Sequence, residues 1–128
     1  MNINNITSEI INAAIEVHDA LGPGLLESVY EKALKRELEL RGLKANTQQP
    51  VDMVYKGVKI ADDLRLDMIV EDTVIIELKS VEELKNVHYK QLQTYLRLLD
   101  KRVGLLINFN VSLLREGLHR VVNNYQDS

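Results

Sequence analysis

The chain has 128 residues, 45% of them hydrophobic and 27% charged, values typical of one globular domain (residues 1–128) with a packed core. It has no cysteine, which excludes disulfides and thiolate metal sites, and neither a signal peptide nor the roughly 18 continuous apolar residues of a membrane span, which favours a cytoplasmic protein with no membrane partner. The net charge of −3 and the absence of tryptophan argue against a basic or aromatic platform for non-specific nucleic-acid binding.

Two helices are predicted at the start of the chain. Thr7 is a good N-cap, and apolar residues recur after it at helical spacing up to Leu21. The sequence Gly22-Pro23-Gly24 ends this helix. A second helix is expected from about Leu25 to Arg41, with Gly42 as its C-terminal glycine.

The second predicted helix carries an apolar stripe and a group of polar residues. The stripe consists of Leu26, Val29, Ala33, Leu34 and Leu38, with Tyr30 beside it. Glu27, Tyr30 and Glu31 are spaced i, i+3 and i+4, so they share a face. On spacing alone, Glu31 forms a surface pair with Lys35, and Glu27 is a first-turn charge that the helix dipole favours.

The segment from Ala45 to Tyr55 is predicted to be extended. Pro50 lies inside it and suits an edge strand, because proline cannot donate a hydrogen bond to a ladder. A turn at 55–58 then leads into a return strand that begins at Val58.

The stretch from Leu64 to Ser80 has the pattern of two strands joined by a polar turn, Glu71-Asp72-Thr73. Apolar residues alternate along both strands, and an antiparallel register can put both apolar sets on one face. That register pairs Val70 with Val74, Met68 with Ile76 and Leu66 with Leu78.

The same register predicts a second face with an unusual charge pattern. Asp67 lies opposite Glu77, and Lys79 lies opposite Arg65. Like charges that face each other directly are unfavourable. Two interpretations remain open: a cation such as Mg²⁺ held between the two carboxylates, or two surface ion pairs, Asp67–Lys79 and Glu77–Arg65.

A third helix is expected from Glu82 to Leu99, with Ser80 as N-cap and Glu83 completing a capping box. Along one side of this helix lie Leu84, Val87, Gln91, Tyr95 and Leu98, and His88 shares a face with Gln91 and Tyr95.

The last elements are strands. The near-continuous apolar run at 103–109 is typical of a strand buried on both faces and reached through a helical crossover, and a final strand is expected at 119–122. The order of elements predicts an α/β fold in which helices flank a mixed central β-sheet.

Asp67 followed by Glu77-Leu78-Lys79 resembles the motif of the PD-(D/E)XK nuclease superfamily, although Leu66 stands where the motif has proline. The resemblance implies a restriction-endonuclease-like core and a site that holds Mg²⁺, with Mn²⁺ as a substitute. It implies that Asp67, Glu77 and the backbone carbonyl of Leu78 bind the metal, and that Lys79 orients or stabilises the attacking water.

Gly24-Leu25-Leu26-Glu27-Ser28-Val29-Tyr30 resembles the signature of the GxxExxY family, a group placed in the same superfamily. This resemblance implies that Glu27 also points into the site as a catalytic and metal-binding carboxylate. Gln91 and Tyr95 resemble a helix motif whose glutamine contacts nucleic acid or the region of the catalytic lysine in related branches. The other open interpretation is that both residues line the polar border of the helix. Tyr30, on the face of Glu27, and Arg65, opposite Lys79, complete the candidate substrate contacts.

Two functions follow as expectations. The first is a Mg²⁺-dependent nuclease that acts on nucleic acid, on DNA more than on RNA. The second is a non-catalytic module with a nuclease fold, which the acidic net charge and the small size favour. A homodimer or a partner protein is compatible with either function.

Overall fold

The computed structural model describes residues 1–125. In chain order its elements are α1 (Ile3–Leu21), α2 (Glu27–Leu40), β1 (Ala45–Pro50), β2 (Met53–Tyr55), β3 (Val58–Ala61), β4 (Arg65–Val70), β5 (Val74–Lys79), α3 (Asn86–Leu98), β6 (Val103–Asn108), the 3₁₀ helix η1 (Leu114–Gly117) and β7 (Leu118–Val122). None of these helices has the length and hydropathy needed to span a membrane.

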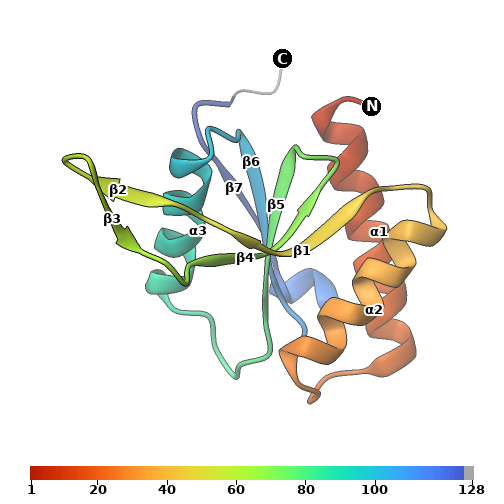
Figure 1. Cartoon of the computed structure of the whole chain (residues 1–128). Helices are drawn as coiled ribbons and strands as arrows, with labels where there is room; N and C mark the ends of the chain where they lie inside the picture. The colour runs from red at the N-terminus through yellow and green to blue at the C-terminus, as the bar shows by residue number, and fades with distance from the viewer. Residues whose placement is uncertain (126–128) are drawn as a thin grey trace.

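A five-stranded sheet in the order β1-β4-β5-β6-β7 forms the centre of the structure. Helices α1 and α2 cover one face of this sheet, and α3 covers the other (Figure 1). Neighbouring strands are antiparallel except β5 and β6, which are parallel and joined through α3. The predicted mixed sheet flanked by helices is confirmed, as is the buried strand after the third helix.

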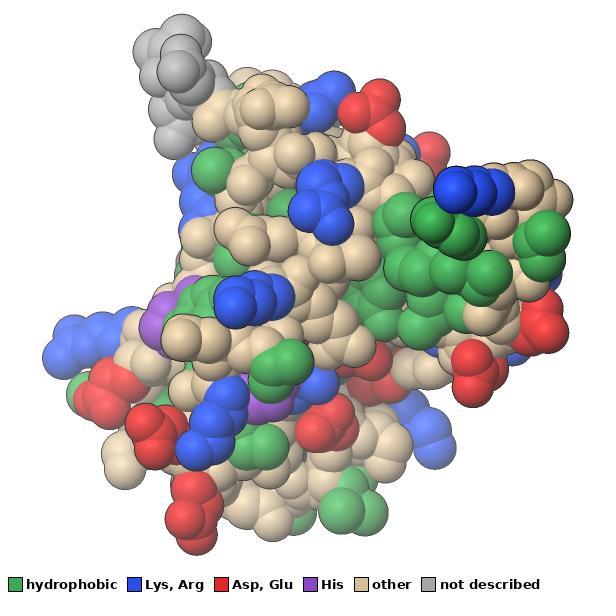
Figure 2. Space-filling view, turned by 90° about the vertical axis from the view of Figure 1, so that its left-hand side faces the viewer, with side chains coloured by type: hydrophobic (Ala, Val, Ile, Leu, Met, Phe, Trp, Pro, Cys, Tyr) green, Lys and Arg blue, Asp and Glu red, His purple; other side chains and the backbone are tan. Residues whose placement is uncertain are grey.

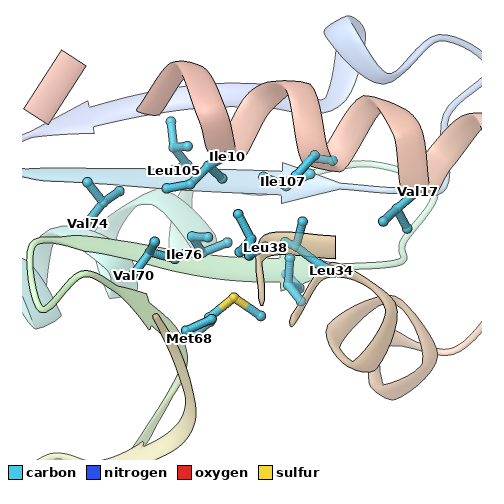
Figure 3. Close-up of a cluster of buried hydrophobic side chains, with 14 of the residues drawn as sticks. Ile10, Val17, Leu34, Leu38, Met68, Val70, Val74, Ile76, Leu105 and Ile107 are labelled. Atoms are coloured by element: carbon cyan, nitrogen blue, oxygen red, sulfur yellow. The ribbon is translucent and has the colours of Figure 1, made fainter. Parts of the chain in front are cut away.

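Two clusters of buried side chains hold the three layers together. The first packs α1 and α2 against the sheet (Figure 3), and it includes Ile10, Val17, Leu34, Leu38, Met68, Val70, Val74, Ile76, Leu105 and Ile107. The second packs α3 against the other face, and it includes Ile69, Ile75, Leu92, Tyr95, Leu96 and Leu106. Successive residues of β5 alternate between the clusters, so this strand is buried on both faces, as strands with helices on both sides are.

Helix α1 begins one turn earlier than predicted. Its N-cap is Asn2, whose side chain accepts a hydrogen bond of 2.8 Å from the backbone N–H of Asn5. Thr7 lies inside the helix, where its hydroxyl donates to the carbonyl of Asn4. The prediction of Thr7 as the N-cap is wrong because an earlier Asn offers an equally good cap.

Helix α3 begins later than predicted, at Asn86. The hydroxyl of Ser80 does not cap it, because this group donates to the carbonyl of Leu25 at 2.6 Å. The helix start is held instead by Nδ1 of His88, which accepts the backbone N–H of Lys85 at 2.9 Å. The predicted capping box at Ser80 and Glu83 is therefore wrong, and Ser80 ties the end of β5 to the start of α2.

The buried face of α2 also differs from the predicted stripe. Tyr30, Leu34 and Leu38 are fully buried, whereas Leu26 is 74% exposed and Val29 is 40% exposed. The helix is turned towards Tyr30 because this ring stacks on Phe109, with centroids 4.4 Å apart. At the other end, Gly42 has φ +79° and its N–H donates to Glu39, which confirms the predicted C-terminal glycine.

Gly117, the last residue of η1, packs directly against the end of β6. A Cβ at this position would overlap the backbone carbonyl oxygen of Asn108. We expect Gly117→Ala to lower the free energy of unfolding by about 2–3 kcal/mol, since backbone must move to admit the methyl group. Urea unfolding would measure this, with the exposed neighbour Glu116→Ala as control; a change within about 0.5 kcal/mol for both variants would contradict the expectation.

Candidate functional site

The ladder between β4 and β5 ends just before the charged residues. It pairs Val70 with Val74, Ile69 with Ile75 and Met68 with Ile76, which confirms the predicted register over this part. Beyond it, Oδ2 of Asp67 accepts a hydrogen bond of 2.8 Å from the backbone N–H of Leu78. The predicted pairing of Leu66 with Leu78 is wrong because the side chain of Asp67 replaces the backbone partner.

The chain is irregular at the same level on the other side of β4. Gln48 of β1, which lies between the residues paired with Met68 and Leu66, has φ +53°. Leu66 packs with the α3-side cluster, although simple alternation places it with Met68. A left-handed residue that is not glycine costs of order 1–3 kcal/mol and is concentrated at functional sites. The left-handed backbone at Gln48 therefore supports a functional site at the level of Asp67 in the sheet.

The backbone carbonyl of Leu78 also faces this gap between the strands. The carbonyl of Lys79 accepts the N–H of Phe109 at 2.9 Å, so Lys79 directs its backbone groups towards β6. Backbone groups of successive strand residues point to opposite sides, so Leu78 directs both its N–H and its carbonyl towards β4. The carbonyl oxygen therefore lies on the side where β4 no longer pairs with β5.

Glu77 is a buried carboxyl group. Only 4% of this residue is exposed, and its Oε1 has no hydrogen-bond partner within residues 1–125. Burial raises the pKa of Glu77 to about 9, and the negative charge of Asp67 raises it as well, while Lys79 lowers it. Without a bound cation, the side chain of Glu77 is therefore protonated at neutral pH.

Lys79 lies two residues after Glu77, at the half-exposed end of β5. None of the ion pairs within residues 1–125 joins Asp67 or Glu77 to a basic residue, so the predicted pairs Asp67–Lys79 and Glu77–Arg65 do not form. Arg65 is exposed at the start of β4, where it pairs with Pro50 of β1 and not with Lys79. The carboxylates thus remain open to another cation.

Asn108 holds the loop that follows Lys79. Its Oδ1 accepts the N–H of Val81 at 3.1 Å, and its Nδ2 donates to the carbonyl of Val81 at 2.9 Å. Asn108 itself is buried and lies beside Lys79 in the parallel pairing of β5 and β6. These two hydrogen bonds fix the backbone of the loop just after Lys79.

Helix α3 carries Gln91 and Tyr95, and Tyr95 packs on the face of the sheet to which Ile75 and, two residues later, Glu77 point. Nε2 of Gln91 donates to the hydroxyl of Tyr95 at 3.2 Å. Burial raises the pKa of Tyr95, the hydrogen bond from Gln91 lowers it, and the charges of Glu77 and Asp67 raise it. The predicted common face of Gln91 and Tyr95 is confirmed, and the charges of Glu77 and Asp67 act on the tyrosine hydroxyl.

Helix α2 carries two glutamates in its first two turns, the predicted Glu27 and also Glu31. Glu27 is exposed in the first turn. One turn later, Glu31 accepts hydrogen bonds from the amide of Gln48 at 3.2 and 3.1 Å. Burial raises the pKa of Glu31, and the charge of Asp67 raises it as well. The charge of Asp67 therefore acts on Glu31, and the predicted ion pair of Glu31 with Lys35 is not among those formed within residues 1–125.

Tyr30 does not fit its predicted role as a substrate contact. The residue is fully buried, and its hydroxyl donates to the carbonyl of Gly22 at 2.5 Å and accepts the N–H of Leu25 at 3.1 Å. Both polar functions of the hydroxyl are thus used inside the protein. Tyr30 therefore stabilises the loop between α1 and α2 through these two hydrogen bonds.

The residues present fit a hard divalent cation. Within residues 1–125 no group of three or more His, Cys, Asp or Glu side chains is arranged to hold a metal ion. Mg²⁺ needs fewer protein ligands, since it is commonly held by one or two carboxylates together with waters and substrate phosphates. The unpartnered Oε1 of Glu77, Asp67 beside it and the carbonyl of Leu78 supply oxygen atoms of this kind.

A paired carboxylate site with a lysine at the open end of the same strand can support metal-assisted attack on a phosphodiester. Fold and site together define an α/β protein of the nuclease type. The family model described as the PD-(D/E)XK nuclease superfamily matches residues 4–121, and the chain belongs to this superfamily. Its nucleases typically use divalent metals. No curated protein and no solved structure matches the chain.

Three residues around the candidate site received no site role from the sequence: Glu31, Gln48 and Asn108. Glu31 and Gln48 meet only because α2 packs beside the edge strand β1, a contact with no local signal in the chain. Asn108 did carry a signal, because a buried strand that ends in asparagine suggests a side chain used for a specific hydrogen bond.

Proposed function

We propose that this protein is a Mg²⁺-dependent nuclease that hydrolyses phosphodiester bonds of nucleic acid, with Mn²⁺ able to substitute. The single observation that carries the proposal is the buried carboxyl group of Glu77, with one oxygen unpartnered among the described residues and with Asp67 beside it. A buried acid of this kind is costly unless it has a partner, and perturbed acids cluster at functional sites.

In this proposal Asp67, Glu77 and the carbonyl of Leu78 hold the metal, which supplies Lewis acidity and an activated water when bound. Lys79 is half-exposed, so its ammonium group can reach a bound phosphodiester and offset the negative charge that develops on it. Gln91 and Tyr95 orient the substrate from α3. Arg65, exposed beside the open end of the strands, adds a further cation for the phosphate backbone.

Helix α2 provides two candidates for a third carboxylate, Glu27 and Glu31. The family signature points to Glu27, and the contact of Ser80 with Leu25 brings the first turn of α2 beside the end of β5. The charge of Asp67 acts on Glu31, which favours the latter. Glu31 also stands at the mouth of a groove that would suit a nucleic-acid strand.

That groove lies between α2 and β1 and has a volume of about 410 Å³. Its lining residues are Ser28, Glu31, Lys32, Lys35, Thr47 and Gln48. Two lysines offer charge to phosphates while their aliphatic stems offer apolar surface to sugars. This local pair of cations supports nucleic acid as the substrate in spite of the net charge of −3, and DNA is the first form to test.

The motif Gly24–Glu27–Tyr30 supports a finer assignment to the GxxExxY group, with the whole chain as one nuclease-like domain. The alternative function is a non-catalytic module for protein interaction. It is favoured by the acidic net charge and by the absence, within residues 1–125, of a third carboxylate arranged with the first two.

Cleavage of labelled DNA and RNA in Mg²⁺ or Mn²⁺ tests the proposal. We expect the wild type to cleave, and Glu77→Gln, which keeps the shape but cannot ionise, to cleave at least about 100-fold more slowly. Glu39→Gln, at an exposed position of α2, is the matched control and should cleave like the wild type. Equal rates for Glu77→Gln and the wild type, or no cleavage of any substrate by the wild type, would contradict the proposal.

A further inference from the structure

The hairpin formed by β2 and β3 pairs with no strand of the central sheet and projects beyond it (Figure 1). Its tip is a two-residue turn, with φ +48° at Lys56 and +82° at Gly57, which is the geometry of a tight type I′ hairpin. A two-stranded hairpin alone is marginally stable in water. A partner that packs on the β2–β3 hairpin would therefore stabilise it.

The hairpin carries a patch of large hydrophobic side chains. Val54, Tyr55, Val58 and Ile60 are between 55% and 63% exposed. Figure 2 shows hydrophobic side chains gathered over this hairpin, on the side of the molecule that lies to the left in Figure 1. Contiguous exposed apolar surface on a soluble domain marks an interaction site.

Two side chains of this patch, Tyr55 and Val58, share one face of the hairpin. Tyr55 is the ladder partner of Val58, so both side chains point to the same face. The register shifts between Met53 and Val54, and Ile60 lies at this irregularity, outside the regular pairs. Val54 faces the other way, opposite Lys59. The apolar face is therefore formed by Tyr55 and Val58, and Ile60 is exposed beside the irregular pair.

Charge is divided between the two ends of the hairpin. The tip carries Lys56, whose Nζ lies 5.4 Å from the centre of the Tyr55 ring. The base carries Asp52, Asp62 and Asp63. Lys59 pairs with Asp52 at 3.3 Å and with Asp62 at 3.7 Å, which leaves the base with an excess of negative charge.

This pattern is complementary to itself. If two identical hairpins pack face to face and antiparallel, the basic tip of each lies against the acidic base of the other, and the two apolar faces meet between them. Such an arrangement is the isologous contact of a two-fold dimer. Nucleic acid fits the surface less well, because the acidic base would repel phosphates.

We propose that the β2–β3 hairpin is the dimer interface of this protein and that its occupant is the same hairpin of a second copy. The proposal is independent of any nuclease activity. The contact involves few large side chains, so it belongs among small interfaces, and we expect a dissociation constant on the order of 10 µM.

Sedimentation velocity across a range from about 1 to 200 µM tests the proposal. The wild type should pass from monomer to dimer over this range. Val58→Asp should remain monomeric, because it places a charge in the centre of the apolar face. Its folding is not at risk, since Val58 is 63% exposed. A wild type that stays monomeric at 200 µM, or a Val58→Asp variant that still dimerises, would overturn it.

A charge exchange tests the antiparallel arrangement. Lys56→Asp should weaken dimerisation at least about tenfold, and adding Asp63→Lys should restore most of the loss, because the opposed pair is rebuilt with reversed signs. A general change in solubility would not give this rescue. Absence of rescue would overturn the antiparallel arrangement of the two hairpins. Loss of DNA binding in Val58→Asp, while the wild type stays monomeric, would show that the surface binds nucleic acid and not a second copy.

Discussion

Lys79→Ala is expected to bind the metal as the wild type does and to cleave about 10²–10³-fold more slowly, the usual cost of removing one group that stabilises transition-state charge. The reason lies in the position of Lys79 on β5. Its backbone is fixed by Phe109 and by the loop that Asn108 holds, whereas its side chain forms none of the ion pairs found within residues 1–125. The ammonium group is therefore available to a substrate.

The matched control is Lys44→Ala, an exposed lysine just before β1, at the end of the sheet away from the carboxylates. Its cleavage rate should not change. Lys79→Arg should recover part of the activity if positive charge alone is required, and little if the geometry of the ammonium group matters. The assignment of Lys79 fails if Lys79→Ala cleaves at the wild-type rate, or if its metal affinity falls as far as its cleavage rate.

The features of the fold that were predicted correctly depend on local patterns in the sequence. Alternating apolar residues defined β4 and β5 and most of their register, and the continuous apolar run defined β6. Gly42 marked the end of α2 because a left-handed residue is needed there. These features depend on the steric and burial preferences of neighbouring residues, so they can be recognised without the rest of the fold.

The sequence did not predict where side chains replace backbone partners. Asp67 takes the N–H that the register gave to Leu66, and Ser80 bonds to Leu25 and so cannot cap α3. Each of these contacts joins residues 11 or more positions apart. They are decided by tertiary packing, which overrides the local preferences that sequence patterns report.

Glu27 and Tyr30 show the same limit within one motif. Both belong to the signature at the start of α2, and spacing alone places them on one face. In the structure the tyrosine hydroxyl is used to close the preceding loop, while the glutamate is exposed. Two residues of one motif therefore have different environments, and only burial and hydrogen bonding separate them.

The affinity for Mg²⁺ is expected to rise about tenfold for each pH unit between pH 6.5 and 8.5. The pKa of Glu77 is about 9 because the carboxyl group is buried and lies beside Asp67. Metal binding requires the ionised carboxylate, so at neutral pH each binding event must release about one proton. Titration calorimetry in two buffers with different ionisation enthalpies measures both the affinity and the proton release. An affinity that does not change over this range would contradict the assignment of Glu77 as a ligand.

Glu77→Gln should lose both the binding and the proton release, while Glu39→Gln should keep them.

The pH dependence of the unfolding free energy of the metal-free protein is a second test of the raised pKa of Glu77. The pKa of Glu77 is about 9 in the folded state and about 4.5 when unfolded, so the folded state holds a proton that the unfolded state loses. The stabilisation that this proton provides is complete below about pH 4.5 and is lost as the pH rises to about 9. At pH 7, about 3 kcal/mol of it has been lost. Glu77→Gln should therefore flatten the decline of the unfolding free energy with pH, and an unchanged slope would mean that Glu77 is already ionised and partnered.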